Sequence, residues 1–127
     1  MEVAIYLFLL AFGLYLTGCV PPQPTPSTCT SAPTISGANY DTLPPPQMTV
    51  TGTCLVSGLV QITINNGSNT WKWTNASGSH SFVIAPGATD TQMVLTNFSP
   101  TLNTSQSSTI TVQTVHGTSA SHSVKYT

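Results

Sequence analysis

Charged side chains are almost missing from this chain. Only 4% of its 127 residues are Asp, Glu, Lys or Arg, and beyond residue 18 the charged residues are Asp41, Lys72, Asp90 and Lys125. Two lysines do not neutralise a phosphate backbone, so we expect no nucleic-acid partner. General acid–base catalysis needs paired carboxylates or a histidine beside one, and the sequence brings no such groups together. We therefore expect no catalytic residues and no enzyme activity.

Residues that bind metals are also few. The chain has three histidines and three cysteines. His116 and His122 flank the turn Gly117-Thr118-Ser119-Ala120-Ser121, and across a hairpin they would form a weak metal pair without a third ligand. Solvated loop histidines explain the same pattern. We expect no metal and no small-molecule cofactor.

The N-terminal residues 3–16 are nearly all Ala, Ile, Leu, Phe and Tyr. This run has the length of a signal-peptide core and is shorter than the roughly 20 residues of a membrane-spanning helix. The sequence that closes it, Leu16-Thr17-Gly18-Cys19, resembles the lipobox of bacterial lipoproteins. The resemblance implies that residues 1–18 are a lipoprotein signal peptide and that lipid is attached to Cys19.

Two residues near this segment bear on the resemblance. The start, Met1-Glu2-Val3, departs from the pattern because it lacks the Lys or Arg that normally orients a signal peptide. A plain secretory signal cleaved elsewhere, or an uncleaved anchor, is the alternative interpretation. Val20 stands where an Asp is the usual signal for inner-membrane retention, so the resemblance implies an exported protein that is lipid-anchored to the outer membrane, on its periplasmic or surface side.

Residues 19–28 contain four prolines, at positions 21, 22, 24 and 26. Proline fixes φ and removes a backbone donor, which favours an extended polyproline II conformation. At about 3.1 Å per residue, such a segment would hold the following domain about 20 Å or more from the membrane. We expect residues 19–28 to be a lipidated, proline-rich tether.

Residues 29–127 have room for one small domain. They show short runs in which apolar residues alternate with polar ones, separated by turn-forming clusters such as Asn65-Asn66-Gly67. This pattern predicts an antiparallel all-β sandwich of six to eight strands. The residues predicted to form its core are Met48, Val50, Cys54, Val60, Ile62, Ile64, Trp71, Trp73, Phe82, Ile84, Ile110, Val112, Val124 and Tyr126.

Trp71 and Trp73 have two interpretations. They lie on the same face of a predicted strand, with Lys72 on the opposite face. Alternation favours a place in the core. Two exposed aromatic rings would instead form a platform on which a sugar stacks, and this makes Trp71 and Trp73 candidate ligand-binding residues.

The domain resembles the bacterial immunoglobulin-like domains of surface proteins. The residues that carry the resemblance are Val50-Thr51-Gly52-Thr53-Cys54, Gly58-Leu59-Val60-Gln61-Ile62-Thr63-Ile64, the segment 67–71 and Ile110-Thr111-Val112. The resemblance covers about three-quarters of the chain and implies an immunoglobulin-like β-sandwich, but no activity. The sequence departs from the family pattern at Cys54 and in the long polar segment 97–108.

Three cysteines in an exported chain are accounted for if Cys19 carries lipid and Cys29 pairs with Cys54. A disulfide that closes a loop of about 25 residues contributes on the order of 3 kcal/mol. The alternative is two buried free thiols.

The surface expected from this composition is nearly neutral and rich in hydroxyl and amide groups. It lacks the charge repulsion that keeps small proteins apart, and the edges of a sandwich accept added strands. We therefore expect a non-enzymatic envelope lipoprotein that binds an envelope protein or itself, in addition to the membrane. The alternative is a surface adhesin or carbohydrate-binding module that uses Trp71 and Trp73.

Overall fold

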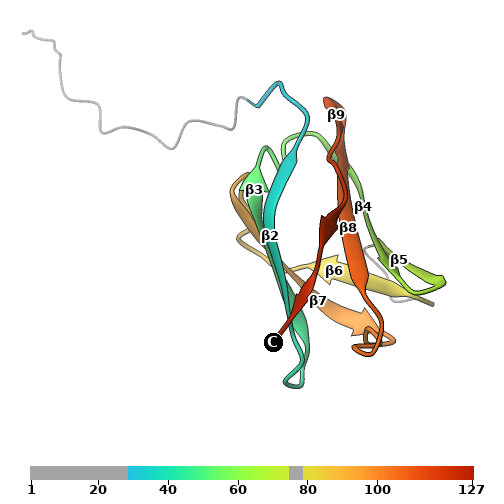
Figure 1. The fold of residues 1–127 in the computed structure, drawn as a ribbon. Helices are drawn as coiled ribbons and strands as arrows, with labels where there is room; N and C mark the ends of the chain where they lie inside the picture. Colours follow the sequence, from blue (N-terminus) through green and yellow to red (C-terminus); the bar gives the residue numbers. More distant parts are fainter. Residues whose placement is uncertain (1–28, 75–78) are drawn as a thin grey trace, which may run out of the picture.

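The computed structural model describes residues 29–74 and 79–127, and these residues form strands, turns and loops without a helix (Figure 1). The prediction of an all-β fold is confirmed. The strands are β2 (Thr34–Asp41), β3 (Gln47–Thr53), β4 (Leu59–Asn66), β5 (Asn69–Trp73), β6 (Ser81–Ile84), β7 (Gln92–Ser99), β8 (Ser108–Thr114), β9 (Gly117–Thr118), β10 (His122–Ser123) and β11 (Lys125–Tyr126).

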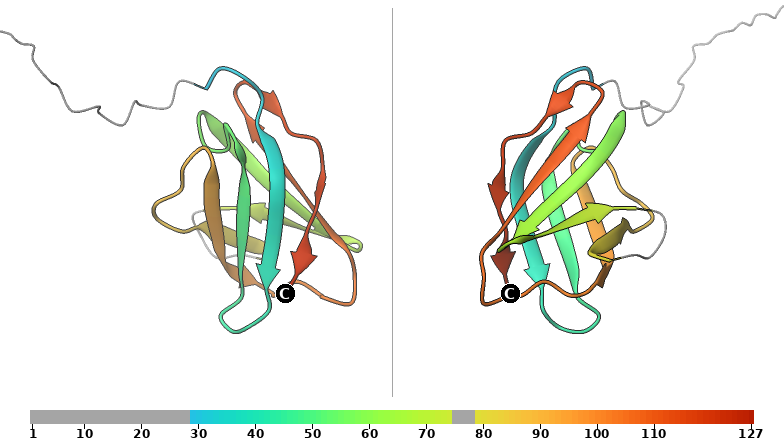
Figure 2. Two further views of the ribbon diagram at one scale, coloured as in Figure 1. Left: turned by 60° about the vertical axis from the view of Figure 1, so that its left-hand side comes forward. Right: turned by 90° about the vertical axis from the view of Figure 1, so that its right-hand side faces the viewer.

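The strands form one strongly curled sheet in the order β10-β8-β4-β5-β6-β7-β3-β2-β11, with β9 beside β8. Two antiparallel groups make up this order. One group contains β10, β8, β4 and β5, and the other contains β6, β7, β3 and β2. The views in Figure 2 show the strands of the two groups wrapped around a common interior.

The expectation of a wholly antiparallel sheet is wrong at the two places where these groups meet. β5 pairs with β6 in parallel, and β11 pairs with β2 in parallel. β6 pairs antiparallel with β7, and this pairing sets the direction of β6. β11 follows directly after β10, so the antiparallel pairing of β10 with β8 sets the direction of β11. Because no hairpin joins the strands at either junction, nothing imposes the antiparallel arrangement there.

Residues 122–126 connect the two ends of the sheet. His122 and Ser123 pair with β8, whereas Lys125 and Tyr126 pair with β2. Between them, the amide of Val124 donates to the carbonyl of Ser108 at 2.9 Å, and the Val124 side chain is buried. One short segment therefore covers parts of two strand edges that would otherwise expose unpaired backbone groups.

The core lies inside the curled sheet and comes from the inward positions of alternating strands. Of the predicted core residues, nine are buried and four more, namely Cys54, Trp73, Ile84 and Tyr126, are partly buried. The buried nine are Met48, Val50, Ile62, Ile64, Trp71, Phe82, Ile110, Val112 and Val124. The sequence reasoning missed Ala38, Tyr40, Leu55, Met93, Leu95, Phe98 and Leu102, which are also buried.

Val60 is the one predicted core residue that is exposed, with 47% of its surface accessible. The register of β4 on β8 shifts between Leu59 and Gln61, so the alternation that holds for Ile62 and Ile64 is interrupted before Gln61. A bulge of this kind places an extra residue against the partner strand. Leu59 packs against the core in place of Val60.

Candidate functional site

The outward positions of β4 and β8 form a face of paired polar side chains, which we call the ladder face. It consists of Gln61, Thr63, Asn65, Thr109, Thr111 and Gln113. Across the two strands, glutamine lies opposite glutamine and threonine opposite threonine. β5 continues the face, since the Thr70 hydroxyl donates to Oδ1 of Asn65 at 2.9 Å. Amides and hydroxyls both donate and accept hydrogen bonds, so this face offers many such groups without charge.

Two exposed valines border the ladder face at one end. Val60 precedes Gln61 on β4, and Val115 follows β8 with 71% of its surface exposed. The amide of Val115 donates to the carbonyl of Gly58 at 2.8 Å, and a Cβ on Gly58 would collide with the Val115 side chain. The valine therefore lies over the backbone that leads into β4. Among the described residues, Leu43 is the only other exposed large aliphatic side chain, and it belongs to the loop between β2 and β3.

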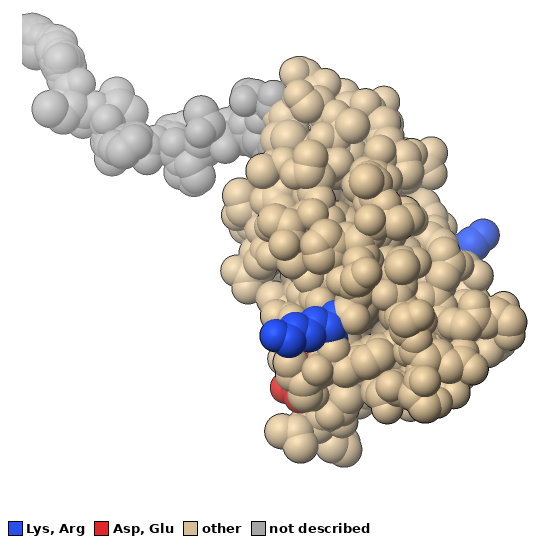
Figure 3. Space-filling view, viewed as in Figure 1, with Lys and Arg blue, Asp and Glu red and all other residues tan. Residues whose placement is uncertain are grey.

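Charge is sparse over the described part of the chain. The face seen in Figure 3 is almost wholly uncharged, with isolated basic and acidic side chains. Lys72 on β5 pairs in register with Thr63 and is the charged residue nearest to the ladder face along the sheet. A partner of this face would meet hydroxyls, amides and methyl groups and, where β5 continues the face, the ammonium group of Lys72.

Trp71 is buried, with 2% of its surface exposed. Its indole nitrogen donates to the carbonyl of Pro100 at 2.8 Å, and the ring of His80 packs edge-on against it with centroids 4.8 Å apart. Trp73 is partly buried against the core. The two rings therefore do not form an exposed pair, and the geometry favours the core interpretation of Trp71 over a sugar-stacking platform.

His116 and His122 lie in different parts of the C-terminal region. His116 is exposed in the turn between β8 and β9, and its amide donates to the Thr114 hydroxyl at 3.1 Å. His122 is in β10. Over residues 29–74 and 79–127, no three His, Cys, Asp or Glu side chains gather in a way that would hold a metal ion.

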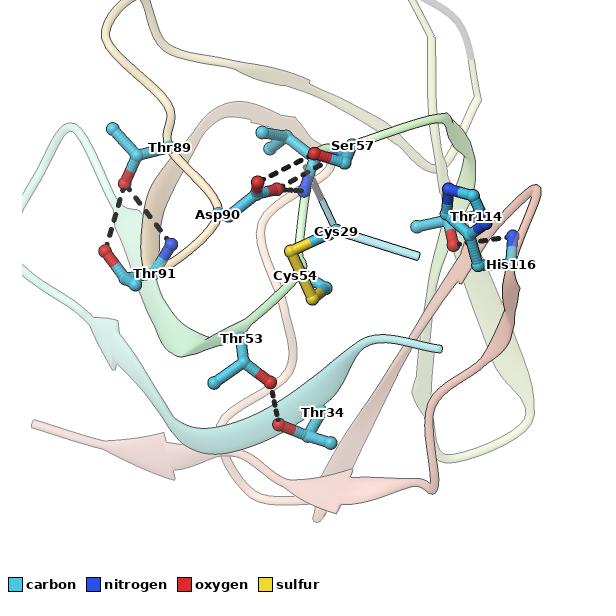
Figure 4. The surroundings of a disulfide bond; sticks show 11 residues. Cys29, Thr34, Thr53, Cys54, Ser57, Thr89, Asp90, Thr91, Thr114 and His116 are labelled. Carbon is cyan, nitrogen blue, oxygen red and sulfur yellow. Dashed lines mark hydrogen bonds between the residues drawn. A yellow bond between two sulfur atoms is a disulfide. The ribbon is translucent and has the colours of Figure 1, made fainter. Parts of the chain in front are cut away.

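Cys29 and Cys54 form a disulfide with their Cα atoms 5.5 Å apart (Figure 4). This agrees with the predicted pairing of Cys29 with Cys54, and both cysteines lie outside the strands. Cys29 precedes β2 by five residues, and Cys54 follows the end of β3 with a positive φ of 54°. The disulfide therefore joins the start of the described chain to the turn after β3.

Asp90 holds the same turn from the other side, as Figure 4 shows. Its Oδ1 accepts from the amides of Val56 at 2.9 Å and Ser57 at 2.8 Å, and its Oδ2 accepts from the Ser57 hydroxyl at 2.7 Å. Partial burial raises the pKa of the carboxyl, but the hydrogen bonds from Ser57 and Val56 outweigh it and leave the pKa below its ordinary value. We call this arrangement of Asp90, Val56 and Ser57 the Asp90 clamp.

Asn66 is the residue of this region that sequence reasoning missed. It is buried, with 1% of its surface exposed, and its Nδ2 donates to the Ser108 hydroxyl at 2.8 Å and the Asn103 carbonyl at 3.0 Å. Its Oδ1 accepts from the amide of Asn103 at 2.9 Å. The sequence gives no signal for this role, because Asn66 stands in an Asn-Asn-Gly stretch that reads only as a turn.

Tyr40 holds the neighbouring part of the loop that follows β7. Its hydroxyl oxygen accepts from the amide of Leu102 at 3.1 Å, deep in the core. Burial raises the pKa of this phenol above its ordinary value, because the charged form would lose its hydration. The hydrogen bonds of Asn66 and Tyr40 together order the polar loop between β7 and β8.

The signal peptide, Cys19 and the proline-rich tether lie outside the described residues, so the structure does not test those predictions. Within residues 29–74 and 79–127 there is no helix with the length and apolar character needed to cross a membrane. Comparison of the chain with models of known protein families and with curated proteins finds no match.

Proposed function

We propose that this protein is a non-enzymatic lipoprotein of the bacterial envelope whose immunoglobulin-like domain docks on another envelope protein through the ladder face. The observation that carries the proposal is the pairing of uncharged hydrogen-bonding side chains across β4 and β8, with Val60 and Val115 exposed at one end. Protein interfaces combine apolar contacts with a limited number of hydrogen bonds. The ladder face supplies the hydrogen-bonding groups, and the bordering Val60 and Val115 supply the apolar contacts.

The strand order supports the immunoglobulin-like assignment. The two antiparallel groups, β6-β7-β3-β2 and β5-β4-β8-β10, correspond to the two sheets of such a sandwich. The parallel contacts of β5 with β6 and of β11 with β2 then join the sheets at their two borders. In this assignment β4 and β8 are central strands of one sheet, and the outer face of that sheet is the ladder face.

The chemistry of the ladder face also indicates the kind of partner. A face with hydroxyls, amides and two valines matches a partner surface that is itself nearly uncharged, because an unpaired partner charge would lose its hydration on binding. With Lys72 as an isolated charge where β5 continues the face, association gains little from electrostatic steering. We therefore expect an affinity that changes little between low and high salt concentration.

The anchoring part of the proposal rests on Cys19. Acyl chains contribute about 0.8 kcal/mol per buried methylene, so attachment through more than one chain is lasting. Expression in a bacterial host with labelled palmitate tests this: we expect wild-type protein to take up the label and Cys19→Ser to lose both label and membrane association. Label that persists in Cys19→Ser, or wild-type protein that partitions into the soluble periplasm, contradicts the anchor.

Site-specific photocrosslinking in intact cells tests the docking face. A photoreactive residue in place of Thr111 probes the ladder face, and one in place of Thr49 is the matched control, since both threonines are partly buried outward residues of central strands. We expect Thr111 to crosslink to one envelope protein and Thr49 to give no such product. Equal crosslinking at both positions, monomer alone, or a product containing only a second copy of this chain contradicts the proposal.

A further inference from the structure

We propose that the Cys29–Cys54 disulfide and the Asp90 clamp form a tension junction, which transfers pulling force from the N-terminal segment to β3 and β7 and keeps it away from β2. The inference rests on the proposed function in one respect, namely that the protein is held at its N-terminal side while the ladder face is bound to a partner. Force between these two attachments enters the described domain at Cys29 and leaves it through β4 and β8.

The N-terminal end of β2 is poorly suited to resist such a force. Its first residue, Thr34, is exposed and is joined to Thr53 by a hydroxyl–hydroxyl hydrogen bond of 2.6 Å. The register of β2 on β3 then shifts between Ile35 and Gly37, which interrupts the ladder close to the point where the force would arrive. Without a crosslink, tension would break these few contacts first and detach β2 from its end.

The disulfide gives the force a shorter covalent path. It joins Cys29 to Cys54 across a sequence separation of 25 residues. Tension that reaches Cys29 therefore passes through the sulfur atoms to Cys54. The chain between the two cysteines forms a closed loop that contains β2 and β3. In this loop β3 adjoins Cys54 directly and shares the force, whereas β2 is separated from Cys29 by residues 30–33 and is bypassed. Figure 4 shows the Thr34–Thr53 contact lying beyond the disulfide, on this loop.

Cys54 is held far more firmly than Thr34. On its C-terminal side, Leu55 is completely buried, and its amide donates to the Asp90 carbonyl at 3.1 Å. The Asp90 carboxylate then holds Val56 and Ser57 through three hydrogen bonds. On the N-terminal side of Cys54, the amide of Gly52 donates to the Thr91 carbonyl at 3.1 Å. Force that reaches Cys54 is therefore shared between the end of β3 and the segment that begins β7.

Single-molecule pulling on the full unlipidated chain tests the junction. One handle is attached at the N-terminal end and the other to a clickable residue in place of Thr111, which reproduces the proposed attachments. For the oxidised chain we expect a single unfolding event. For the double variant Cys29→Ser/Cys54→Ser we expect an earlier release of β2 at lower force, and a total extension longer by about 85 Å, since each freed residue adds about 3.5 Å.

A third substitution separates the tension path from a general loss of stability. Thr34→Ala removes the hydroxyl contact with Thr53. We expect it to leave the unfolding force of the oxidised chain unchanged and to lower the force of the early event in the disulfide-free chain. Equal unfolding forces with and without the disulfide, or an effect of Thr34→Ala in the oxidised chain, overturn the proposal.

A separate variant covers the case in which the disulfide-free chain does not fold. Asp90→Asn keeps the disulfide and weakens the clamp. We expect a lower unfolding force with the same total extension, and an unchanged force overturns the proposal. Because these measurements need neither the membrane nor the partner, their failure would leave the crosslinking and acylation tests of the proposed function untouched.

Discussion

Asn66 and Tyr126 meet inside the protein although 60 residues separate them in the sequence: Nδ2 of Asn66 lies 3.2 Å from the phenol oxygen of Tyr126. The same phenol donates to the carbonyl of Gln106 at 2.6 Å. Through these contacts the end of β4, the polar loop before β8 and the C-terminal segment are held by one network. Such networks rigidify a fold when every member is satisfied and are costly when one member is removed.

Asn66→Ala is therefore expected to lower the free energy of unfolding by about 3 kcal/mol, since it removes the hydrogen bonds of the buried Asn66 side chain to the Ser108 hydroxyl and to the backbone of Asn103. Urea denaturation followed by circular dichroism measures the change. Asn65→Ala is the control: Asn65 is exposed and should change stability by no more than about 0.5 kcal/mol. Similar losses for the two variants would contradict the assigned role of Asn66.

Asp90 makes stability depend on pH in the acidic range. Its pKa is lowered in the folded state, so the contribution of the charged carboxylate is fully present above the unfolded pKa of about 3.8 and is lost as pH falls through the folded pKa. We expect Asp90→Asn to cost about 1 kcal/mol at pH 7 and progressively less below about pH 4, where wild type loses the same interaction.

Denaturation midpoints between pH 7 and pH 2.5 measure this effect of Asp90. Asp41→Asn is the matched control, because the Asp41 carboxylate accepts from the amide of Leu43 in an exposed position at the end of β2. The control should follow the wild-type pH profile. An Asp90→Asn curve parallel to wild type at every pH would show that the clamp does not depend on charge.

Trp71 is expected to behave as a core residue in fluorescence. The chain contains two tryptophans, so Trp73→Phe leaves Trp71 as the only indole emitter. We expect blue-shifted emission and weak quenching by acrylamide from this variant, and stronger quenching from Trp71→Phe, in which the partly buried Trp73 remains. Trp71→Ala should lower the free energy of unfolding by about 3–5 kcal/mol. Ready quenching of Trp71 would reopen the carbohydrate-binding interpretation.

Gly52 marks a close approach of two strands. A Cβ at this position would collide with the backbone carbonyl of Thr34, so the backbone at the start of β2 would have to shift. We expect Gly52→Ala to cost about 1–3 kcal/mol. Gly37→Ala is the control, since its Cβ would meet only the hydroxyl of Thr51, a side chain that rotates away. Hydrogen exchange of the β2 amides locates the damage, and equal effects of the two variants would contradict the steric argument.

The alternation of apolar residues was sufficient to predict most of the core. Ile62, Ile64, Ile110 and Val112 follow it because they lie in regularly paired parts of β4 and β8. Val60 does not, because a register shift is a property of two strands together and leaves no mark in the sequence of one. Local pattern therefore predicts the face of a residue only where the ladder is regular.

The candidate site was less predictable than the core. That Thr63 faces Thr111 depends on the register of two strands that are far apart in the chain, and sequence periodicity does not fix this register. The disulfide could be predicted because the chain has three cysteines, and the expectation of lipid on Cys19 left Cys29 and Cys54 as the pair. Asn66 could not, because its partners come from a loop 37 residues away and from the C-terminal segment.

The position of residues 122–126 has a consequence for the order of events during export. This segment follows every strand that it joins, and a chain that crosses a membrane from its N-terminus delivers β2 and β8 before it delivers β10 and β11. Until then both strands present unpaired backbone groups, which are sites for mispairing with other chains. For a chain exported as we propose, the arrival of the segment around Val124 ends the period of risk.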